Sequence, residues 1–379
     1  MSAGRAVADR VRDAAERRTR LRVRAGGHWM HANRPVAADA ELPLAACAGI
    51  SEYVPGDLTL TAGAATTLGE IADATRAHGQ WLALDPFGSD DGTVGATVAT
   101  ASSGPLAAAF GTPRDQLLGV EFVTGAGDVV RAGGRVVKNV AGFDLARLVT
   151  GAWGTLGAIT EVTVRLRARP AGDETLALAL DDDGPALDRV GAQLRALATA
   201  PLAAELVDAR LARRLALPER PLLLVRIGGN AESMRAQRDA VAALGAATPV
   251  DGAVWSAMRG ADVSGDAVWR LSRGPARFAD CWRDAAARLA PFAGARLQGS
   301  PLRGIVRCVV PCDTIPAAPD GALAGALARP AVGTLVAETL PDGAWAQVPC
   351  PVNDRLSRGA RAAFDPAGIL NPGILGATP

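Results

Sequence analysis

The sequence lacks the cysteine spacing that iron–sulfur and zinc sites require. Its five cysteines stand at positions 47, 281, 308, 312 and 350, and none forms a Cys-x-x-Cys pair. The closest two, Cys308 and Cys312, have no histidine or further cysteine near them. Because such sites need several ligands at set spacings, we expect buried free thiols and no metal site in this chain.

The sequence also lacks long apolar runs and an excess of either charge. No uninterrupted apolar stretch approaches the ~20 residues of a membrane helix. The net charge is +1, with both signs spread along the chain, which argues against nucleic acid as a partner. The arginine-rich runs at 17–20 and 210–214 fit solvated helix faces. The N-terminus shows no apolar segment of a secretory signal, so we expect a cytoplasmic protein that reaches a membrane only through a partner.

A length of 379 residues predicts two domains. In the first ~170 residues, local patterns predict the following elements: a helix over 7–18, strands over 21–24 and 59–61, a helix from a Thr67–Glu70 capping box to His78 with Gly79 after it, a strand over 80–84, strands over 120–123 and 129–131, a helix over 144–151 and a strand over 159–166. The Gly125-Ala126-Gly127 segment predicts a hairpin turn, because the third glycine and the helix of a dinucleotide motif are missing.

The pattern changes after Pro170. Residues 171–183 predict a loop or strand followed by an acidic run. Helices are expected over 187–198 and 233–244, with strands over 204–207 and 222–227. This order favours a separate α+β domain, while 250–350 is less periodic and is left undivided.

Small residues are most concentrated between Asp85 and Arg169. Three segments stand out: Gly92-Thr93-Val94-Gly95-Ala96-Thr97, Lys138-Asn139-Val140-Ala141-Gly142-Phe143-Asp144, and Gly154-Thr155-Leu156-Gly157-Ala158-Ile159-Thr160. Glycine allows a main chain to come within hydrogen-bonding distance of a ligand where a Cβ would clash. Three such loops predict a long ligand held along its length by backbone groups.

These segments, in this order, resemble the FAD-binding domain of D-lactate dehydrogenases, vanillyl-alcohol-oxidase-type (PCMH-type) flavoenzymes and glycolate oxidases. The smaller, E-type FAD-binding subunits of bacterial glycolate oxidase are the most similar group. The strong match covers about a quarter of the chain. The C-terminal run Phe364-Asp365-Pro366-Ala367-Gly368-Ile369-Leu370-Asn371-Pro372-Gly373 resembles the closing signature of the same flavoproteins.

The resemblance implies an α+β protein. A PCMH-type FAD-binding domain of two α/β subdomains would occupy residues 1–170. An α+β cap domain with a mainly antiparallel sheet would occupy 171–350, and residues 351–379 would return to the FAD domain.

The same resemblance implies which residues bind FAD. The turn after Arg24 would wrap the pyrophosphate in backbone N–H groups, as a nest for anions, although an ordinary strand-end turn is equally compatible with these residues. The Thr93 segment would offer hydroxyls to phosphate. The same residues fit a helix N-terminus packed on a sheet, and both can hold at once because a helix N-terminus also favours anions. Asp144 is as compatible with a plain helix N-cap as with a flavin contact, and Phe143 replaces the tyrosine usual in the family. The main chain of Ile159 would contact the flavin pyrimidine. The full predicted set is Arg24, Gly26, Gly27, His28, Asp85, Thr93, Val94, Gly95, Ala96, Thr97, Ser102, Ser103, Gly104, Asn139, Gly142, Asp144, Gly154, Thr155, Gly157 and Ile159.

His28 raises a separate hypothesis. Some related flavoenzymes attach FAD covalently through a histidine in an Arg-x-Gly-Gly-His turn, and the same residues stand here at 24–28. His31 and His78 have no comparable context and fit exposed or capping positions.

The catalytic constellation of the relatives is missing. Oxidation of a 2-hydroxy acid needs a base for the hydroxyl proton and a cation for the carboxylate. The catalytic relatives use a His-rich motif in the second domain, whereas this chain has no histidine after His78. Four arginines, at 270, 273, 303 and 307, are candidates for the cation, with surface ion pairs as the default expectation. Catalytic residues therefore stay unassigned.

The resemblance implies an FAD-binding oxidoreductase subunit of a glycolate oxidase-like complex. It would pass electrons toward an iron–sulfur subunit, and a larger catalytic flavoprotein would oxidise the 2-hydroxy acid. Two alternatives stay open at this point. One is a self-sufficient FAD-dependent dehydrogenase or oxidase of another hydroxy acid or alcohol. The other is a scaffold subunit that has lost FAD.

Overall fold

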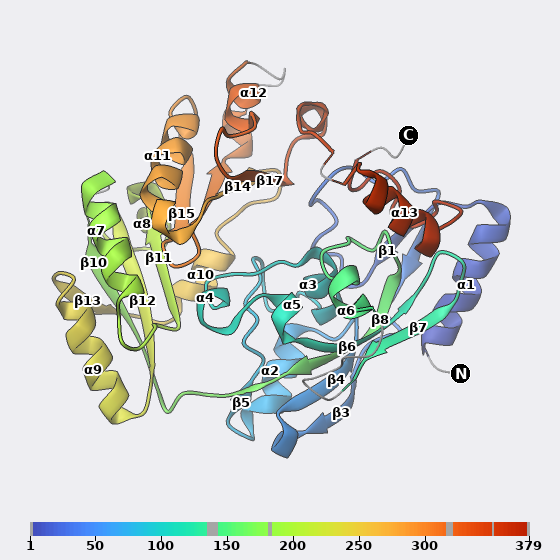
Figure 1. The fold of residues 1–379 in the computed structure, drawn as a ribbon, viewed down its shortest axis with the longest axis horizontal. Helices are drawn as coiled ribbons and strands as arrows, with labels where there is room; N and C mark the ends of the chain where they lie inside the picture. Colours follow the sequence, from blue (N-terminus) through green and yellow to red (C-terminus); the bar gives the residue numbers. More distant parts are fainter. Residues whose placement is uncertain (1–2, 135–142, 181–183, 316–320, 351, 377–379) are drawn as a thin grey trace. The chain divides into compact units, whose positions relative to one another are not determined.

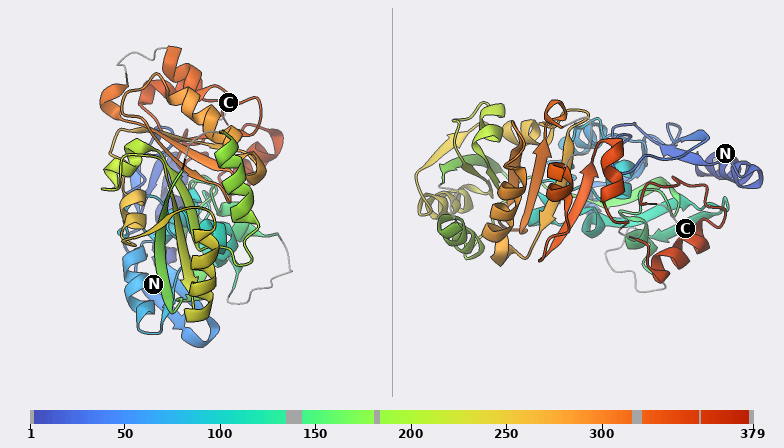
Figure 2. Two further views of the ribbon diagram at one scale, coloured as in Figure 1. Left: turned by 90° about the vertical axis from the view of Figure 1, so that its left-hand side faces the viewer. Right: turned by 90° about the horizontal axis from the view of Figure 1, so that it is seen from above.

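The computed structural model describes residues 3–134, 143–180, 184–315, 321–350 and 352–376. The chain divides into two compact units (Figure 1). The first unit comprises residues 1–104, 110–169 and 349–379, and the second comprises 105–109 and 170–348. The N-terminal and C-terminal helices α1 (Ala3–Arg17) and α13 (Arg355–Phe364) both belong to the first unit (Figure 2).

The N-terminal helix and strands of the first unit pack together with the C-terminal segment of the chain in one small buried cluster. Helix α1 presents Val7 and Val11 to a buried cluster. Strand β1 (Leu21–Arg24) pairs in parallel with β2 (Ala40–Pro43), and Leu21 also bridges Leu370. Ile369 and Leu370 belong to the same buried cluster as Val7. The C-terminal signature is therefore part of this core.

The centre of the first unit is a five-stranded antiparallel sheet in the order β3-β4-β8-β6-β7. Its strands are β3 (Ile50–Val54), β4 (Thr59–Gly63), β6 (Leu117–Val123), β7 (Val129–Gly133) and β8 (Ala158–Arg165). Three helices pack on this sheet: α2 (Leu68–Arg76), α3 (Val94–Thr100) and α6 (Leu145–Val149). They contribute Ile71, Val98 and Val149, respectively, to its buried core. Further elements of this unit are the pair β5 (Gln80–Trp81) and β9 (Arg167–Ala168) and the single turn α5 (Pro113–Gln116). The single turn α4 (Ala107–Phe110) lies mostly in the second unit.

The second unit is built on an eight-stranded antiparallel sheet in the order β13-β10-β12-β11-β15-β16-β14-β17. Its strands are β10 (Gly172–Ala179), β11 (Ala203–Val207), β12 (Leu222–Gly229), β13 (Ala247–Val250), β14 (Ala267–Ser272), β15 (Arg296–Ser300), β16 (Ile305–Val310) and β17 (Thr334–Thr339). Its helices are α7 (Gly184–Arg195), α8 (Ala209–Arg214), α9 (Ala231–Ala242), α10 (Val254–Arg259), α11 (Phe278–Leu289) and α12 (Gly321–Leu327). The largest buried side chains here, Trp269 and Trp282, lie in one cluster with α11. The α+β architecture with an antiparallel sheet in the C-terminal part confirms the predicted fold class.

Most local predictions agree with the structure, and the differences are short. The Thr67–Glu70 capping box is present, but α2 ends at Arg76 because the chain turns there and Gly79 adopts a φ of +60°. The strand expected over 80–84 is only the pair Gln80–Trp81. Residues 120–131 form the expected hairpin.

Two further expectations can be compared with the described residues. Cys47, Cys281 and Cys308 are buried, whereas Cys312 is exposed and Cys350 half-buried, which corrects the expectation for these last two. Cys312 begins a one-turn 3-10 helix after β16, which carries it out of the sheet. Nowhere in the described ranges does a helix combine the length and apolar composition needed to cross a bilayer.

Candidate functional site

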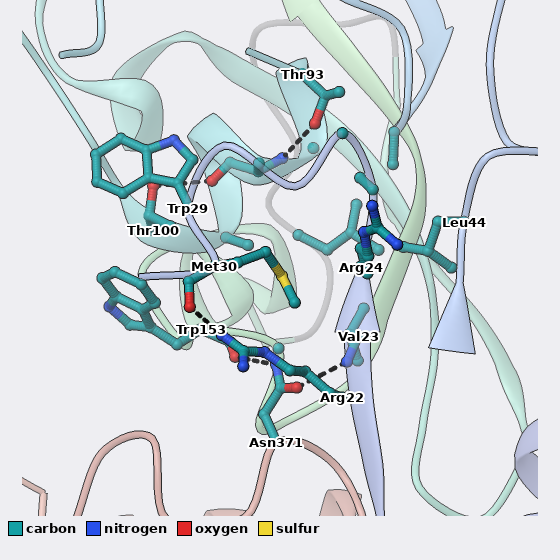
Figure 3. A pocket seen from close by; sticks show the side chains of 18 of the residues that line it. Arg22, Val23, Arg24, Trp29, Met30, Leu44, Thr93, Thr100, Trp153 and Asn371 are labelled. Carbon is teal, nitrogen blue, oxygen red and sulfur yellow. Dashed lines mark hydrogen bonds between the residues drawn. The ribbon is translucent and has the colours of Figure 1, made fainter. Parts of the chain in front are cut away.

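A pocket in the first unit gathers the end of β1, the start of α3, the start of β8 and the C-terminal signature (Figure 3). It encloses about 770 Å³ that protein atoms leave empty, part of it open to solvent. Ten of the predicted residues line it: Arg24, Gly26, Gly27, His28, Thr93, Gly95, Ala96, Gly154, Gly157 and Ile159.

The turn after β1 carries a row of backbone N–H groups on residues that line this pocket. No hydrogen bond within the described residues uses the N–H groups of residues 25–29. The turn is held from behind, because the Arg22 guanidinium donates to Met30 O and Arg24 Nη1 lies 3.1 Å from Glu41 Oε2. Gly27 has a φ of +91°, which favours glycine. Successive free N–H groups in such a turn form a concave site for anions.

The start of α3 contributes shape, and its polar groups are already paired. The N–H groups of Val94 and Gly95 donate to Thr66 O and Ala64 O, both at 2.9 Å. Thr93 Oγ1 accepts from Ala96 N at 3.3 Å, and Thr97 Oγ1 donates to Thr93 O at 3.0 Å. Thr93 and Thr97 therefore cap and brace the helix through their hydroxyl oxygens, and the packed helix start describes this segment. The contact of these residues with phosphate stays a prediction.

The third loop is fastened to the C-terminal signature. Asn371 Oδ1 accepts from Val23 N at 2.8 Å, and Asn371 Nδ2 donates to Trp153 O at 2.7 Å. Gly154 has a φ of +70°, and a Cβ there would lie 2.7 Å from Asn371 Nδ2. Ile159 is buried and pairs with Phe122 of β6 across the ladder. One buried amide thus joins the end of β1 to the loop before β8.

Eight predicted residues do not line the pocket. Asp85 and Gly104 pack against each other, since a Cβ on Gly104 would lie 2.0 Å from Asp85 O. Asp144 caps α6, with Oδ1 accepting from Arg147 N at 3.0 Å, so the N-cap alternative describes it. The others are Val94, Thr97, Ser102, Ser103 and Thr155, of which Ser102 is half-buried and the rest buried.

Two predicted residues, Asn139 and Gly142, lie outside the described residues, together with Lys138, Val140 and Ala141. Phe143, which follows them, is 93% exposed. His28 is exposed at the pocket, and His31 and His78 are exposed outside it.

The pocket also contains residues that the sequence did not single out. Trp29, Met30, Trp153, Asn371 and Ile374 all line it. Asn371 stands inside the quoted C-terminal signature and Trp153 directly precedes the Gly154–Thr160 segment, so their place in or beside those motifs was an available signal. Trp29 and Met30 directly follow the Arg24–His28 turn, and only their position in the chain points to them.

Residues 4–133 match the model of the FAD binding domain family, so this part of the chain is an FAD binding domain. The chain is thus a flavoprotein with FAD as its cofactor, as predicted. The free N–H groups of residues 25–29 suit the anionic diphosphate that this cofactor carries.

The chain is similar to glycolate oxidase subunits. It is 36% identical over 173 residues to glycolate oxidase subunit GlcE of Escherichia coli. The aligned region covers 45% of this chain and 49% of that protein. It is 33% identical over 154 residues to glycolate oxidase subunit GlcD of Bacillus subtilis, covering 41% and 31% respectively. The matched regions therefore span half or less of these relatives' length.

The fold is shared with solved enzyme structures. The structure of p-cresol methylhydroxylase with substrate bound aligns over 100% of this chain and 88% of that chain, with a TM-score of 0.71 and 14% identity. At this identity the likeness concerns the fold alone. It supports the PCMH-type architecture that the sequence predicted.

Proposed function

We propose that this chain is the FAD-carrying oxidoreductase subunit of a 2-hydroxy acid oxidising complex of the glycolate oxidase type. The observation that carries the proposal is the row of unpaired N–H groups at residues 25–29 on the pocket wall. These donors would hold the diphosphate of FAD, and Gly154, Gly157 and Ile159 would line the remainder of the cofactor site.

Bound FAD supplies a two-electron acceptor for oxidation of a carbon that carries a hydroxyl group. In the described part of the second unit, three of the four candidate arginines already pair with carboxylates. Arg307 is buried and lies 2.6 Å from Asp262 and 3.0 Å from Glu338. Arg270 and Arg273 also face carboxylates, Glu338 at 3.8 Å and Asp284 at 2.8 Å. Arg307 is thus paired inside the unit and not at the surface as expected, and these three arginines already neutralise carboxylates of the chain.

These pairings favour a division of labour. A larger flavoprotein partner would bind and oxidise the hydroxy acid, and an iron–sulfur partner would take electrons onward. The similarity to two different glycolate oxidase subunits supports a complex. Any contact with a membrane would come through these partners.

The proposal is tested with the purified full chain and with the complex. We expect the chain to bind FAD and to show no dye reduction with glycolate or D-lactate, and activity to appear after co-expression with its partners. Turnover of a hydroxy acid by the chain alone would favour the self-sufficient enzyme. Failure to bind FAD would favour the scaffold.

A matched pair of variants tests the pyrophosphate turn. Gly27 and Gly79 both have positive φ angles, +91° and +60°, but only Gly27 lines the pocket. Gly27→Ala strains the turn and should weaken FAD binding at least tenfold. Gly79→Ala introduces similar backbone strain at the end of α2 and should leave FAD affinity unchanged. Equal effects on affinity would contradict the assignment of this turn.

His28 allows a simple test of attachment. Its imidazole is exposed at the pocket, so it can reach a ligand there. If His28 holds FAD covalently, acid precipitation leaves the colour in the pellet and His28→Ala releases it. Colour in the supernatant of the wild type excludes the linkage.

A further inference from the structure

Two tryptophans on the pocket wall have no role in the core of the first unit. Trp29 and Trp153 are half-buried, line the pocket and are absent from the unit's buried apolar clusters. Their rings meet edge to face, with centroids 6.2 Å apart and planes at 82°. Neither indole N–H takes part in a hydrogen bond within the described residues. Figure 3 shows both rings on the same side of the pocket, away from Arg24 and Leu44.

The backbone holds both tryptophans firmly in place. Trp153 has a φ of +54°, a left-handed conformation that is uncommon for a bulky residue. It is fixed on both sides, because Trp153 N donates to Ala99 O at 2.8 Å and Trp153 O accepts from Asn371 Nδ2 at 2.7 Å. The residue after Trp29, Met30, is held through its carbonyl by Arg22. Such strain persists where the surroundings enforce one geometry, and it is often found at ligand sites.

We propose that Trp29 and Trp153 form an aromatic subsite that stacks on a planar ring of the bound dinucleotide, and that Asn371 is the positioning residue that sets Trp153. This inference rests on the proposed FAD site and assigns two specificity-determining side chains to it. Both ends of FAD carry a planar heteroaromatic ring, adenine at one end and isoalloxazine at the other, and either offers the chemistry that an indole face recognises.

The test compares ring-removing with ring-retaining variants of the full chain. The variants Trp153→Leu and Trp29→Leu keep an apolar side chain that adopts the same backbone conformation, but they remove the ring. The variants Trp153→Phe and Trp29→Phe keep a ring. Dissociation constants are measured by calorimetry for FAD, FMN and ADP. Stacking on an aromatic side chain contributes ~1–3 kcal/mol, so each Leu variant should bind FAD about 5- to 140-fold more weakly. The Phe variants should recover most of that loss.

The two shorter ligands identify the ring. A parallel loss for ADP with unchanged FMN binding assigns the subsite to adenine, and the reverse assigns it to isoalloxazine. Leu variants that are folded, as judged by their thermal unfolding, and that bind FAD as tightly as wild type would overturn the subsite. A wild-type chain that binds no FAD would instead overturn the proposed function.

The positioning role of Asn371 is tested by a double-mutant cycle. Asn371→Ala should weaken FAD binding in the wild-type background and have little further effect in the Trp153→Leu background. A purely structural role would reduce affinity by the same factor in both backgrounds, and that result would remove Asn371 from the proposal.

Discussion

Gly95 in α3 should not tolerate even a methyl group, although it stands in a helix. A Cβ on Gly95 would lie 2.5 Å from Ala64 Cβ, 2.7 Å from Ala64 O and 2.8 Å from Ala64 Cα. Two of these atoms belong to the backbone, and Gly95 N donates to the same Ala64 O at 2.9 Å. The Gly95→Ala variant must therefore push α3 away from the chain that follows β4, at the wall of the pocket.

The expected change in the free energy of unfolding follows from two opposing effects. Overpacking a well-packed position costs ~1–3 kcal/mol. Alanine recovers up to ~1 kcal/mol over glycine through helix propensity. Subtracting the full gain leaves a net loss of roughly 0–2 kcal/mol in the free energy of unfolding. We expect the upper half of this range, because two of the three close atoms are backbone atoms that cannot rotate away. In a unit of about 200 residues a loss of ~1–2 kcal/mol lowers Tm by ~2–8 °C.

Gly359 in α13 provides the control. It lies in the same unit and in a helix, and a Cβ there would meet no atom within 4 Å. Gly359→Ala should raise Tm by ~1–4 °C through helix propensity alone. Thermal unfolding followed by circular dichroism compares the two variants without FAD. An unchanged Tm for Gly95→Ala, or equal shifts for both variants, would refute the packing argument.

Two further predictions concern ionisable groups. Hydrogen bonds from the Arg20 side chain and backbone N–H hold the pKa of Asp39 at about 2, so this pair stabilises the fold above the unfolded pKa of ~3.9 and loses its effect as the pH falls toward 2. Arg20→Met should bring the Asp39 pKa back toward ~3.9 in a carboxyl NMR titration, and an unmoved pKa would contradict the pairing. Among the thiols, Cys312 is exposed, whereas burial raises the pKa of Cys281 to about 11 and raises that of Cys308 as well. A thiol reagent should therefore label Cys312 in the native protein and these two only after unfolding, and early labelling of Cys308 would be the contrary result.

Local signals predicted the elements of the first unit well. The capping box at Thr67 and Glu70 is complete within four residues, and α2 begins as that pattern predicts. The Arg24–His28 turn follows directly from a short strand and lines the pocket, and its role at the pyrophosphate stays a prediction. These features depend on neighbouring residues and so can be read from the chain.

Non-local contacts account for what the sequence did not predict. Asn371 pairs with Val23 across 348 positions of sequence, and no local pattern reports such a contact. The glycines were interpreted as room for a ligand, yet a Cβ on Gly157 would lie 2.4 Å from the Phe122 ring. Close packing within the protein therefore explains part of the glycine content, as it does at Gly95.

The most direct test of the account is an absorption spectrum of the purified full chain, taken before and after incubation with FAD and removal of the unbound cofactor. We expect flavin absorption bands that stay with the protein, and weaker retention in Gly27→Ala than in Gly79→Ala. A chain that stays colourless after incubation with FAD would contradict the central claim.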